Sequence, residues 1–315
     1  MARIVFLGNF RVSYTTETHH VKTLESLGHK VLKFQESEAR SEDILNMALK
    51  SDLFVWVHTH GWKTPGSFSM EEVLEKLKAK GVPTMTYHLD LWFGLNRQKD
   101  LDINPVYKNI QHFFTVDPQM ADWFNKETKV IGHYVRPGVY DKECTFEAAP
   151  LRHDVIFVGS KQYHKEWNYR PTLIDWLTRT YRRRFELYGK DGKGVVRNQE
   201  LNDLYASTKI VVGDTLSPNF DYPGYWSDRI YETNGRGGFL IHPYIKGLEE
   251  EFTDKEHVVF YEYKNFNQLK NLIDYYIEHD EEREAIRQAG HELVKSKYTY
   301  KDRWEQILKE VLKSE

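Results

Sequence analysis

The sequence has very little of what several protein classes require. It contains a single cysteine, Cys144, which excludes an intramolecular disulfide and a multi-cysteine zinc site and favours a reducing compartment. It has no apolar run of about 18 residues that could span a membrane. Met1 leads directly into the strand-like residues 3–7, without the apolar region of a signal peptide. We therefore expect a cytoplasmic protein.

An excess of positive charge is also missing. The formal net charge is −3 and the sequence pI is about 6.5, so no global field concentrates nucleic acid or anionic membranes. The longest block of positive charge is residues 182–184, all arginine, which we interpret as a solvated face, with a local groove near residues 179–184 left open. Aromatic residues, in contrast, are abundant, with 20 Tyr, 17 Phe and 8 Trp.

The length and the hydrophobic pattern predict two α/β domains. A chain of 315 residues accommodates two domains of roughly 150 residues each. Short β-branched and aromatic runs alternate with helical patterns, which is typical of parallel, doubly wound sheets. The expected strands lie near residues 3–7, 30–34, 52–57, 83–87 and 112–116 in the first half, and near 154–158, 184–188, 209–213, 238–241 and 257–260 in the second.

An irregular stretch marks the predicted domain boundary. Residues 136–150 carry proline, glycine and no regular period, so we place the first domain at residues 1–150 and the second at 151–298. A last helix is predicted over residues 299–315. In open parallel sheets ligands bind beyond the carboxyl ends of the strands, so the loops that follow strands are the candidate sites.

Two such loops fall in the first half. In residues 8–17, Gly8 and Asn9 are candidates to bind a substrate that donates a group, and Tyr14 and Thr16 to bind the substrate that accepts it. Helix capping by Thr15 or Thr16 is the alternative. This loop lacks the G-x-G-x-x-G spacing of a dinucleotide site, which argues against an oxidoreductase.

The other loop of the first half follows the strand near 83–87. His88 and Asp90 are two residues apart, and either could position or deprotonate an acceptor hydroxyl. Capping of a turn by Asp90 is the alternative. We predict Asp90, then His88, as catalytic residues, ahead of His58 and His60, and Trp92 as an acceptor contact.

Two further loops fall in the second half. After the strand near 154–158, Ser160, Lys161 and Arg170 are candidates to bind a diphosphate and neutralise its charge. Residues 225–241 combine a helix that bears Asp228, Arg229 and Glu232 with a turn that contains Gly237 and Gly238. An intrahelical salt bridge between Arg229 and Glu232 is the alternative interpretation.

The segment around Glu232 resembles the nucleotide-sugar signature of GT-B glycosyltransferases, in which a glutamate and, five residues later, a glycine precede a core strand. The similarity is to the spore-maturation-protein-like branch, and it extends through "GLEEEF" at 247–252 and the C-terminal "REAIRQAGHELVKSKYTYKDRWEQIL". It implies the GT-B architecture, with two Rossmann-like domains facing a cleft and a C-terminal helix that crosses back to the first domain.

The resemblance also implies roles for individual residues. Glu232 is expected to bind the donor ribose and Arg229 to lie near the phosphates, with Asp228 beside them and the backbone at Gly237 and Gly238 approaching the diphosphate. Many retaining relatives carry another glutamate eight residues earlier, where this chain has Gly224, so retention or inversion at the anomeric carbon stays open.

The predicted function is transfer of a sugar from a nucleoside diphosphate sugar to an acceptor hydroxyl, without a cofactor or metal, since no D-x-D element in a suitable context occurs. The acceptor is open: a glycan, a cell-wall polymer, a metabolite, a protein or a hydroxylated base in DNA. The alternatives are a nucleotide-sugar epimerase-like enzyme and a noncatalytic nucleotide- or sugar-binding module.

Overall fold

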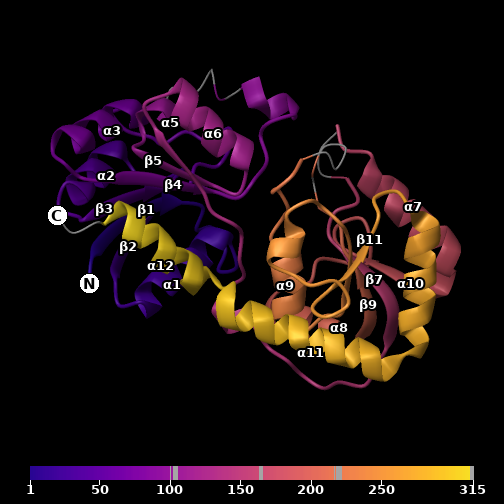
Figure 1. The fold of residues 1–315 in the computed structure, drawn as a ribbon. Helices are drawn as coiled ribbons and strands as arrows, with labels where there is room; N and C mark the ends of the chain where they lie inside the picture. Colours follow the sequence, from indigo (N-terminus) through magenta and orange to yellow (C-terminus); the bar gives the residue numbers. More distant parts are fainter. Residues whose placement is uncertain (100, 102–105, 163–165, 216, 218–221, 313–315) are drawn as a thin grey trace. The chain divides into compact units, whose positions relative to one another are not determined.

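The computed structural model describes residues 1–99, 101, 106–162, 166–215, 217 and 222–312. The described chain divides into two compact units (Figure 1). Unit 1 comprises Met1–Arg136 together with Tyr300–Glu315, and unit 2 comprises Pro137–Thr299. Among the described residues, none of the helices combines the length and apolar character needed to cross a bilayer.

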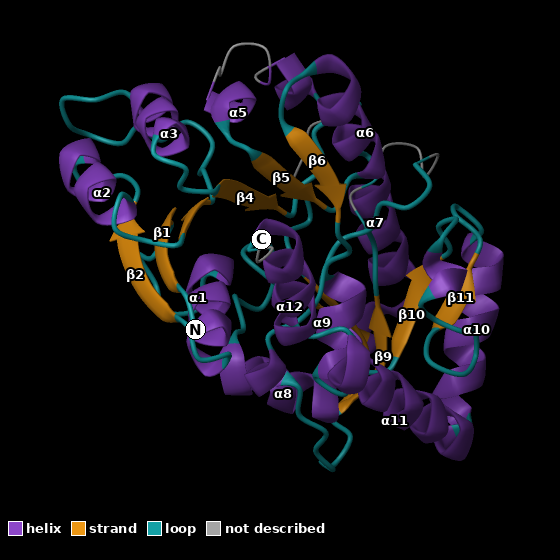
Figure 2. Ribbon diagram, turned by 60° about the vertical axis from the view of Figure 1, so that its left-hand side comes forward, coloured by secondary structure: helices purple, strands orange, loops and turns teal. Residues whose placement is uncertain are grey.

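Unit 1 contains a six-stranded sheet in the order β2-β1-β3-β4-β5-β6, in which every pair of neighbouring strands is parallel. Helices cover both faces of this sheet (Figure 2). Its strands are β1 (Arg3–Gly8), β2 (Lys30–Gln35), β3 (Leu53–Trp56), β4 (Thr84–His88), β5 (His112–Thr115) and β6 (Ile131–Tyr134). Its helices are α1 (Thr16–Ser26), α2 (Ser41–Ala48), α3 (Met70–Ala79), α5 (Val106–Asn109), α6 (Pro118–Glu127) and α12 (Tyr300–Val311).

Alternation along the strands determines how this sheet is covered. Successive side chains of a strand point to opposite faces, so Val5 and Leu7 of β1 join a core with α2 and α3, while Phe6 packs against Trp304 of α12 at a ring-centroid distance of 6.3 Å. Both faces of the sheet are therefore buried at β1, as expected for a central parallel strand.

Unit 2 repeats this design with a five-stranded parallel sheet in the order β11-β10-β9-β7-β8. Two hydrophobic cores lie on its two faces, one with α7 and α10 and the other with α8 and α9. Its strands are β7 (His153–Val158), β8 (Phe185–Tyr188), β9 (Thr208–Val212), β10 (Leu240–Pro243) and β11 (Val259–Tyr261). Its helices are α7 (Tyr169–Tyr181), α8 (Asn198–Ala206), α9 (Arg229–Gly235), α10 (Phe266–Glu278) and α11 (Asp280–Lys297).

One strand of unit 1, β6, was not expected from the sequence. Its residues are Ile-Gly-His-Tyr, which show neither a continuous apolar run nor an alternation. Gly132 is required there because a Cβ atom at this position would lie 2.3 Å from the carbonyl oxygen of Ala121 in α6. Glycine, a poor strand former, is thus required here by the close approach of a helix backbone, and no sequence pattern indicates such an approach.

The division into units differs from the predicted boundary at residue 150. Residues 137–150 are grouped with unit 2 because polar contacts fasten them there. Arg287 donates a hydrogen bond of 2.8 Å to the carbonyl oxygen of Glu147, and Arg236 forms an ion pair with Glu143. Buried arginines that use backbone and carboxylate partners hold this irregular segment in place.

The last helix returns to unit 1, as the sequence predicts. Helix α12 starts at Tyr300 and packs on α1 (Figures 1 and 2). Trp304 is fully buried, and its indole Nε1 donates to His20 Nδ1 over 3.0 Å. The ring of Tyr300 packs on His20 in a tilted arrangement, with 4.5 Å between the ring centroids. Burial lowers the pKa of His20 to about 3, so this imidazole stays neutral and accepts the indole hydrogen. Residues 313–315 of the predicted helix lie outside the described residues.

Replacement of Trp304 by alanine removes this anchor. We expect Trp304→Ala to lower the free energy of unfolding by about 3–5 kcal/mol, because it opens a cavity and leaves His20 Nδ1 without its donor. Glu305→Ala, on the exposed side of the same helix, serves as the control and is expected to stay within about 0.5 kcal/mol. Chemical denaturation of both variants measures the difference, and equal effects would contradict the role given to α12.

Candidate functional site

The strand order locates a crevice in each sheet. In unit 2 the chain runs from β7 to β8 on one side and then to β9 on the other, so the switch point lies between the carboxyl ends of β7 and β9. Gly159 and Ser160 follow β7, and Gly213 and Asp214 follow β9. Helix α9 starts after the same edge and brings Arg229 to it.

Arg229 lies directly on the end of β7. Its guanidinium group donates to the carbonyl oxygen of Val158, and its Cζ atom lies 5.4 Å from the ring centre of Phe157. A Cβ atom on Gly159 would lie only 2.9 Å from Arg229 Nη2, so glycine at this position makes room for the arginine. The Nε atom of Arg229 is buried without a hydrogen-bond partner among the described residues. Its charge is therefore only partly compensated, which suits an anionic ligand.

Glu232 lies one turn further along α9. Among the described residues its carboxylate forms neither a hydrogen bond nor an ion pair. The charge of Glu232 acts on Arg236 and Tyr205 at longer range. The salt bridge between Arg229 and Glu232, considered as an alternative above, does not form in the described structure. Both side chains thus keep hydrogen-bonding capacity for a ligand.

Arg170 is placed differently from the prediction. It is buried at the start of α7, and its Nε donates to Asp214 Oδ2 over 2.8 Å, while Nη1 donates to the carbonyl oxygen of Ser160 over 3.3 Å. Its charge is already neutralised by Asp214, so a direct contact with phosphate is not supported. The pair instead joins the loops after β7 and β9 and fixes the shape of the crevice. Gly213 and Asp214 directly follow β9 and could have indicated a polar partner for Arg170, but they were not considered in the sequence analysis.

Lys161 is likewise engaged. Its backbone N–H donates to Asp191 over 2.9 Å, and its Nζ atom lies 2.5 Å from Asp175 of α7. Both side chains of this ion pair are well exposed, at 38% and 53%. An exposed pair of this kind is weak, so a ligand could replace Asp175 as the partner of Lys161.

Gly237 and Gly238 do not lie with this group. They precede β10, at the edge of the sheet where strands begin, whereas Arg229 and Glu232 lie on the helix that starts at the opposite edge. The carbonyl oxygen of Gly237 accepts from Arg287, and a Cβ atom on Gly238 would lie 2.8 Å from Thr233 Cγ2. The structure therefore argues against their predicted contact with the diphosphate, because they pack the end of α9 against the unit. Asp228, at the N-cap of α9, is close to the crevice.

Unit 1 has its own switch point, between β1 and β3. Glu17, in the first turn of α1, lies over the end of β1, where its Cγ atom would be 3.1 Å from a Cβ atom on Gly8. The pKa of Glu17 is raised from its ordinary value of 4.5 to about 7. Burial is the largest cause, backbone hydrogen bonds act against it, and the nearby carboxylates Glu36 and Asp90 add to it. A carboxyl group that titrates near neutrality at a sheet edge is typical of functional sites.

Both ring nitrogens of His88 have hydrogen-bond partners, which argues against its predicted role as a base. Its Nε2 accepts from Trp92 Nε1 over 2.7 Å, and its Nδ1 donates to the carbonyl oxygen of Asp90 over 3.1 Å. Burial lowers its pKa to about 4, and neither ring nitrogen is left over. Trp92 is only 2% exposed and belongs to the core, which also argues against its role as an acceptor contact. These two residues stabilise the loop after β4.

The remaining predicted residues of unit 1 occupy its carboxyl edge. Asp90 has a half-exposed side chain and lies 3.5 Å from Arg97 Nη1. Tyr14 is 44% exposed, whereas the carbonyl oxygen of Asn9 accepts from Thr15, the N-cap of α1. Thr16 is the first residue of that helix. The capping interpretation of this loop is thus realised by Thr15, while Asp90 and Tyr14 remain accessible.

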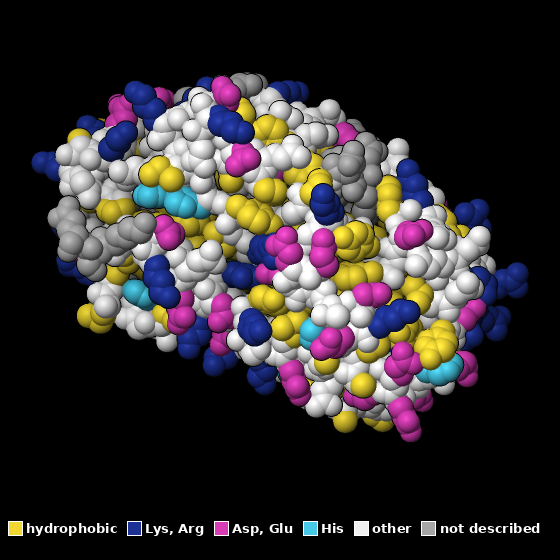
Figure 3. Space-filling view, in the orientation of Figure 1, with side chains coloured by type: hydrophobic (Ala, Val, Ile, Leu, Met, Phe, Trp, Pro, Cys, Tyr) yellow, Lys and Arg dark blue, Asp and Glu magenta, His cyan; other side chains and the backbone are white. Residues whose placement is uncertain are grey.

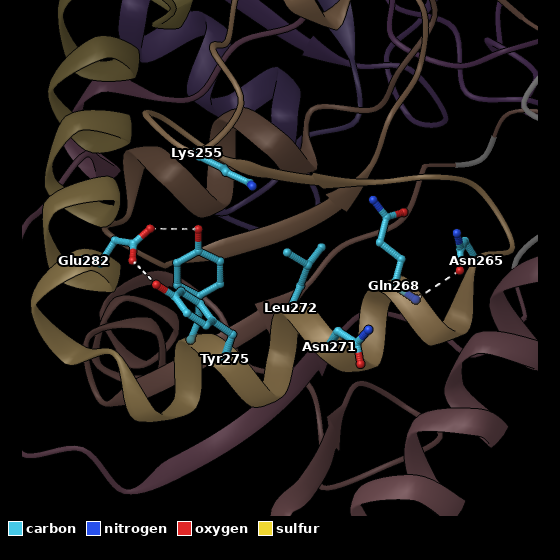
Figure 4. A pocket seen from close by; sticks show the side chains of 8 residues that line it. Lys255, Asn265, Gln268, Asn271, Leu272, Tyr275 and Glu282 are labelled. Carbon is cyan, nitrogen blue, oxygen red and sulfur yellow. Dashed lines mark hydrogen bonds between the residues drawn. The ribbon is translucent and has the colours of Figure 1, made fainter.

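A pocket elsewhere in unit 2 is separate from these edges. It has a volume of about 560 Å³ and is lined by α10 and the start of α11 (Figure 4). In this pocket Glu282 accepts hydrogen bonds from the hydroxyls of Tyr275, at 2.7 Å, and Tyr276, at 3.4 Å. It shares no residue with either switch point, and we assign it no part in the chemistry.

Comparison with known proteins connects this geometry to a family. Residues 170–309, which include α7 and α9, match the family model described as glycosyl transferase-like. This part of the chain is similar to that family. The sequence resemblance to GT-B glycosyltransferases is thereby confirmed, although no curated protein sequence matches the chain.

The fold is also that of GT-B glycosyltransferases over the whole chain. HepE from Anabaena in complex with UDP-glucose is similar with a TM-score of 0.67 and 11% identity over 100% of both chains. Sucrose-phosphate synthase from Thermosynechococcus elongatus gives 0.67 and 10% over 100% of both. An alpha-glucosyltransferase in complex with UDP-glucose and DNA containing an abasic site gives 0.72 and 10% over 99% of both. The predicted architecture is confirmed.

The raised pKa of Glu17 generates a prediction. Because the pKa is higher in the folded than in the unfolded state, its contribution to stability is complete below about pH 4.5 and is lost as the pH rises through about 7. Glu17→Gln imitates the protonated form. We expect this variant to gain up to about 3 kcal/mol of unfolding free energy over the wild type between pH 5 and pH 8. The exposed Glu25→Gln on the same helix is the control, and parallel curves for Glu17→Gln and the wild type would contradict the assignment.

Proposed function

We propose that this chain transfers a sugar from a nucleoside diphosphate sugar to an acceptor hydroxyl, with the donor bound by unit 2. The observation that carries the proposal is the pair Arg229 and Glu232 at the carboxyl edge of the second sheet. The arginine has a buried Nε atom without a partner, and the glutamate has a carboxylate without a hydrogen bond among the described residues. An anion and a diol, such as the diphosphate and ribose of a nucleotide, complement these two groups.

The proposed chemistry is stabilisation of the leaving group. When the bond between the anomeric carbon and the phosphate oxygen breaks, negative charge develops on the diphosphate, where Arg229, Lys161 and the backbone N–H groups of the loop after β7 would meet it. Arg170 takes part indirectly, because its pair with Asp214 holds that loop. This arrangement supplies positive charge from the chain itself, so we propose that transfer requires neither a metal nor another cofactor.

Unit 1 would bind the acceptor. Its carboxyl edge presents Glu17, His58 and Asp90, groups that accept hydrogen bonds from hydroxyls.

The surface charge bears on the acceptor class. On the face shown in Figure 3, basic and acidic side chains of the described residues are interspersed rather than gathered into one basic area. With a net charge of −3, the chain offers little nonspecific attraction for nucleic acid. One structural neighbour is an alpha-glucosyltransferase in complex with UDP-glucose and DNA containing an abasic site. We rank neutral hydroxylated acceptors above DNA and keep a hydroxylated base as the second candidate.

The other functions considered are less well supported. An epimerase-like enzyme and a noncatalytic module would both use a nucleotide site, but the family match is to transferases. Cys144 is buried, and burial raises the pKa of its thiol to about 12, so it does not act as a nucleophile. A single buried thiol also fits the proposed cytoplasmic location.

The Glu232→Ala variant tests the donor site. We expect it to weaken binding of the matching nucleoside diphosphate by about 1–3 kcal/mol, because the ribose hydroxyls lose their acceptor. Calorimetric titration with UDP, GDP, ADP and dTDP in the presence of EDTA measures the effect and also tests the independence from metal.

Glu200→Ala is the matched control for this titration, since Glu200 is exposed on α8 of the same unit. Its affinity should equal that of the wild type. Unchanged nucleotide affinity in Glu232→Ala, or no binding of any nucleotide to the wild type, would refute the donor site.

A further inference from the structure

A cluster of hydrogen-bonded side chains around Glu36, near the switch point of unit 1, has not been given a role above. This residue directly follows β2, and its side chain is completely buried. Its carboxylate accepts three hydrogen bonds, from Trp56 Nε1 at 2.9 Å, from the backbone N–H of Thr59 at 2.8 Å and from His58 Nδ1. A buried carboxylate with this many donors is held rigidly.

The contact with Glu36 determines the state of the His58 ring. Because Nδ1 donates its hydrogen to the carboxylate, the neutral imidazole carries its free lone pair on Nε2. No described residue forms a hydrogen bond with Nε2, and 9% of the His58 side-chain surface is exposed. The ring is further fixed by edge contacts with Trp56, at 5.1 Å between centroids, and with Tyr107, at 6.0 Å.

The position of His58 matches the chemistry. It follows β3, and the crevice of this sheet opens between β1 and β3, where Glu17 also lies. His88 of the neighbouring loop has both ring nitrogens occupied, as described above. Asp90 is exposed and paired with Arg97. Among these groups, His58 combines an oriented ring with a vacant nitrogen.

We infer that His58 is the catalytic base of unit 1 and that Glu36 is its positioning residue. The inference rests on the proposed glycosyl transfer. The acceptor oxygen forms its bond to the anomeric carbon while its proton passes to His58 Nε2. The bond between that carbon and the phosphate oxygen breaks, and its electron pair leaves with the nucleoside diphosphate. The imidazolium so formed is stabilised by the Glu36 carboxylate.

Several charged or titratable groups surround the imidazole. Glu36 contacts it directly, Tyr107 of α5 packs against it, and His88 at the end of β4 interacts with it electrostatically. Glu17 interacts with Glu36 from α1. Assigning a pH profile to His58 and Glu36 therefore requires variants of both residues.

The test uses water as the simplest acceptor. UDP-, GDP-, ADP- and dTDP-glucose are each incubated with the full chain from pH 5 to pH 9, and release of the nucleoside diphosphate is followed. We expect the rate of wild-type release to increase with pH, because a general base acts in its unprotonated form. His58→Gln should lower the rate by about 10²–10⁴-fold, the usual contribution of a general base, and abolish this pH dependence. Added imidazole should restore part of the rate in His58→Ala.

Matched variants separate a chemical from a structural role. Glu36→Gln should lower the rate and alter the pH profile, whereas His60→Gln, an exposed histidine of the same loop, should stay within about twofold of the wild type. Nucleotide affinity should be unchanged in all of them, because the proposed donor site is in unit 2.

Two results overturn these proposals in distinguishable ways. If His58→Gln releases the nucleoside diphosphate at the wild-type rate, or if imidazole does not restore the rate in His58→Ala, His58 is not the catalytic base. The proposed transfer is unaffected by either result. An absence of release from all four donors, together with no nucleotide binding, refutes the proposed transfer first.

Discussion

Parallel pairing of the strands is the constraint on which the candidate site depends. Each sheet has all its carboxyl ends at one edge, and a crevice opens only where the strand order reverses. This places Glu17 and His58 together in unit 1, and Arg229 with the loop after β7 in unit 2, although they are far apart in the sequence. Residues before the strands, such as Gly237 and Gly238, are directed to the other edge and serve packing.

The two units use a buried carboxylate in the same way. Asp214 follows β9 and holds Arg170, and Glu36 follows β2 and holds His58. Burial of a carboxylate is costly unless hydrogen bonds compensate it. Asp214 obtains part of that compensation from Arg170 of α7, and Glu36 obtains it from Trp56, His58 and the backbone N–H of Thr59. The energy of these contacts is thus used to fix the geometry of the crevice rather than to fill a core.

Much of the fold was predictable because most of its central strands are buried on both faces. Ten strands follow apolar or β-branched runs that the sequence shows directly, and the helix after Thr299 follows a clear amphipathic pattern. Strand β6 was missed because it contains Gly132, which is required by the close approach of the α6 backbone and not by the strand itself. The domain boundary differs because buried arginines, which have no periodic signature, attach residues 137–150 to unit 2.

The candidate site was predictable only in part, for a physical reason. A motif indicated Arg229 and Glu232, but the occupancy of each hydrogen-bonding atom decides which side chains remain available. Arg170 and His88 are suitable residue types in suitable loops, yet Asp214 and Trp92 occupy them. His58 was ranked below Asp90 because Glu36 lies 22 residues away and nothing in the sequence joins them.

The central claim is that the edge formed by Arg229 and Glu232 holds the nucleotide of an activated sugar. Co-crystallisation of the full chain with the nucleoside diphosphate that binds best tests it most directly. The account predicts phosphate oxygens within hydrogen-bond distance of the Arg229 guanidinium and ribose hydroxyls on the Glu232 carboxylate. A nucleotide bound in the pocket on α10, or anywhere away from the carboxyl edge of the second sheet, would contradict it.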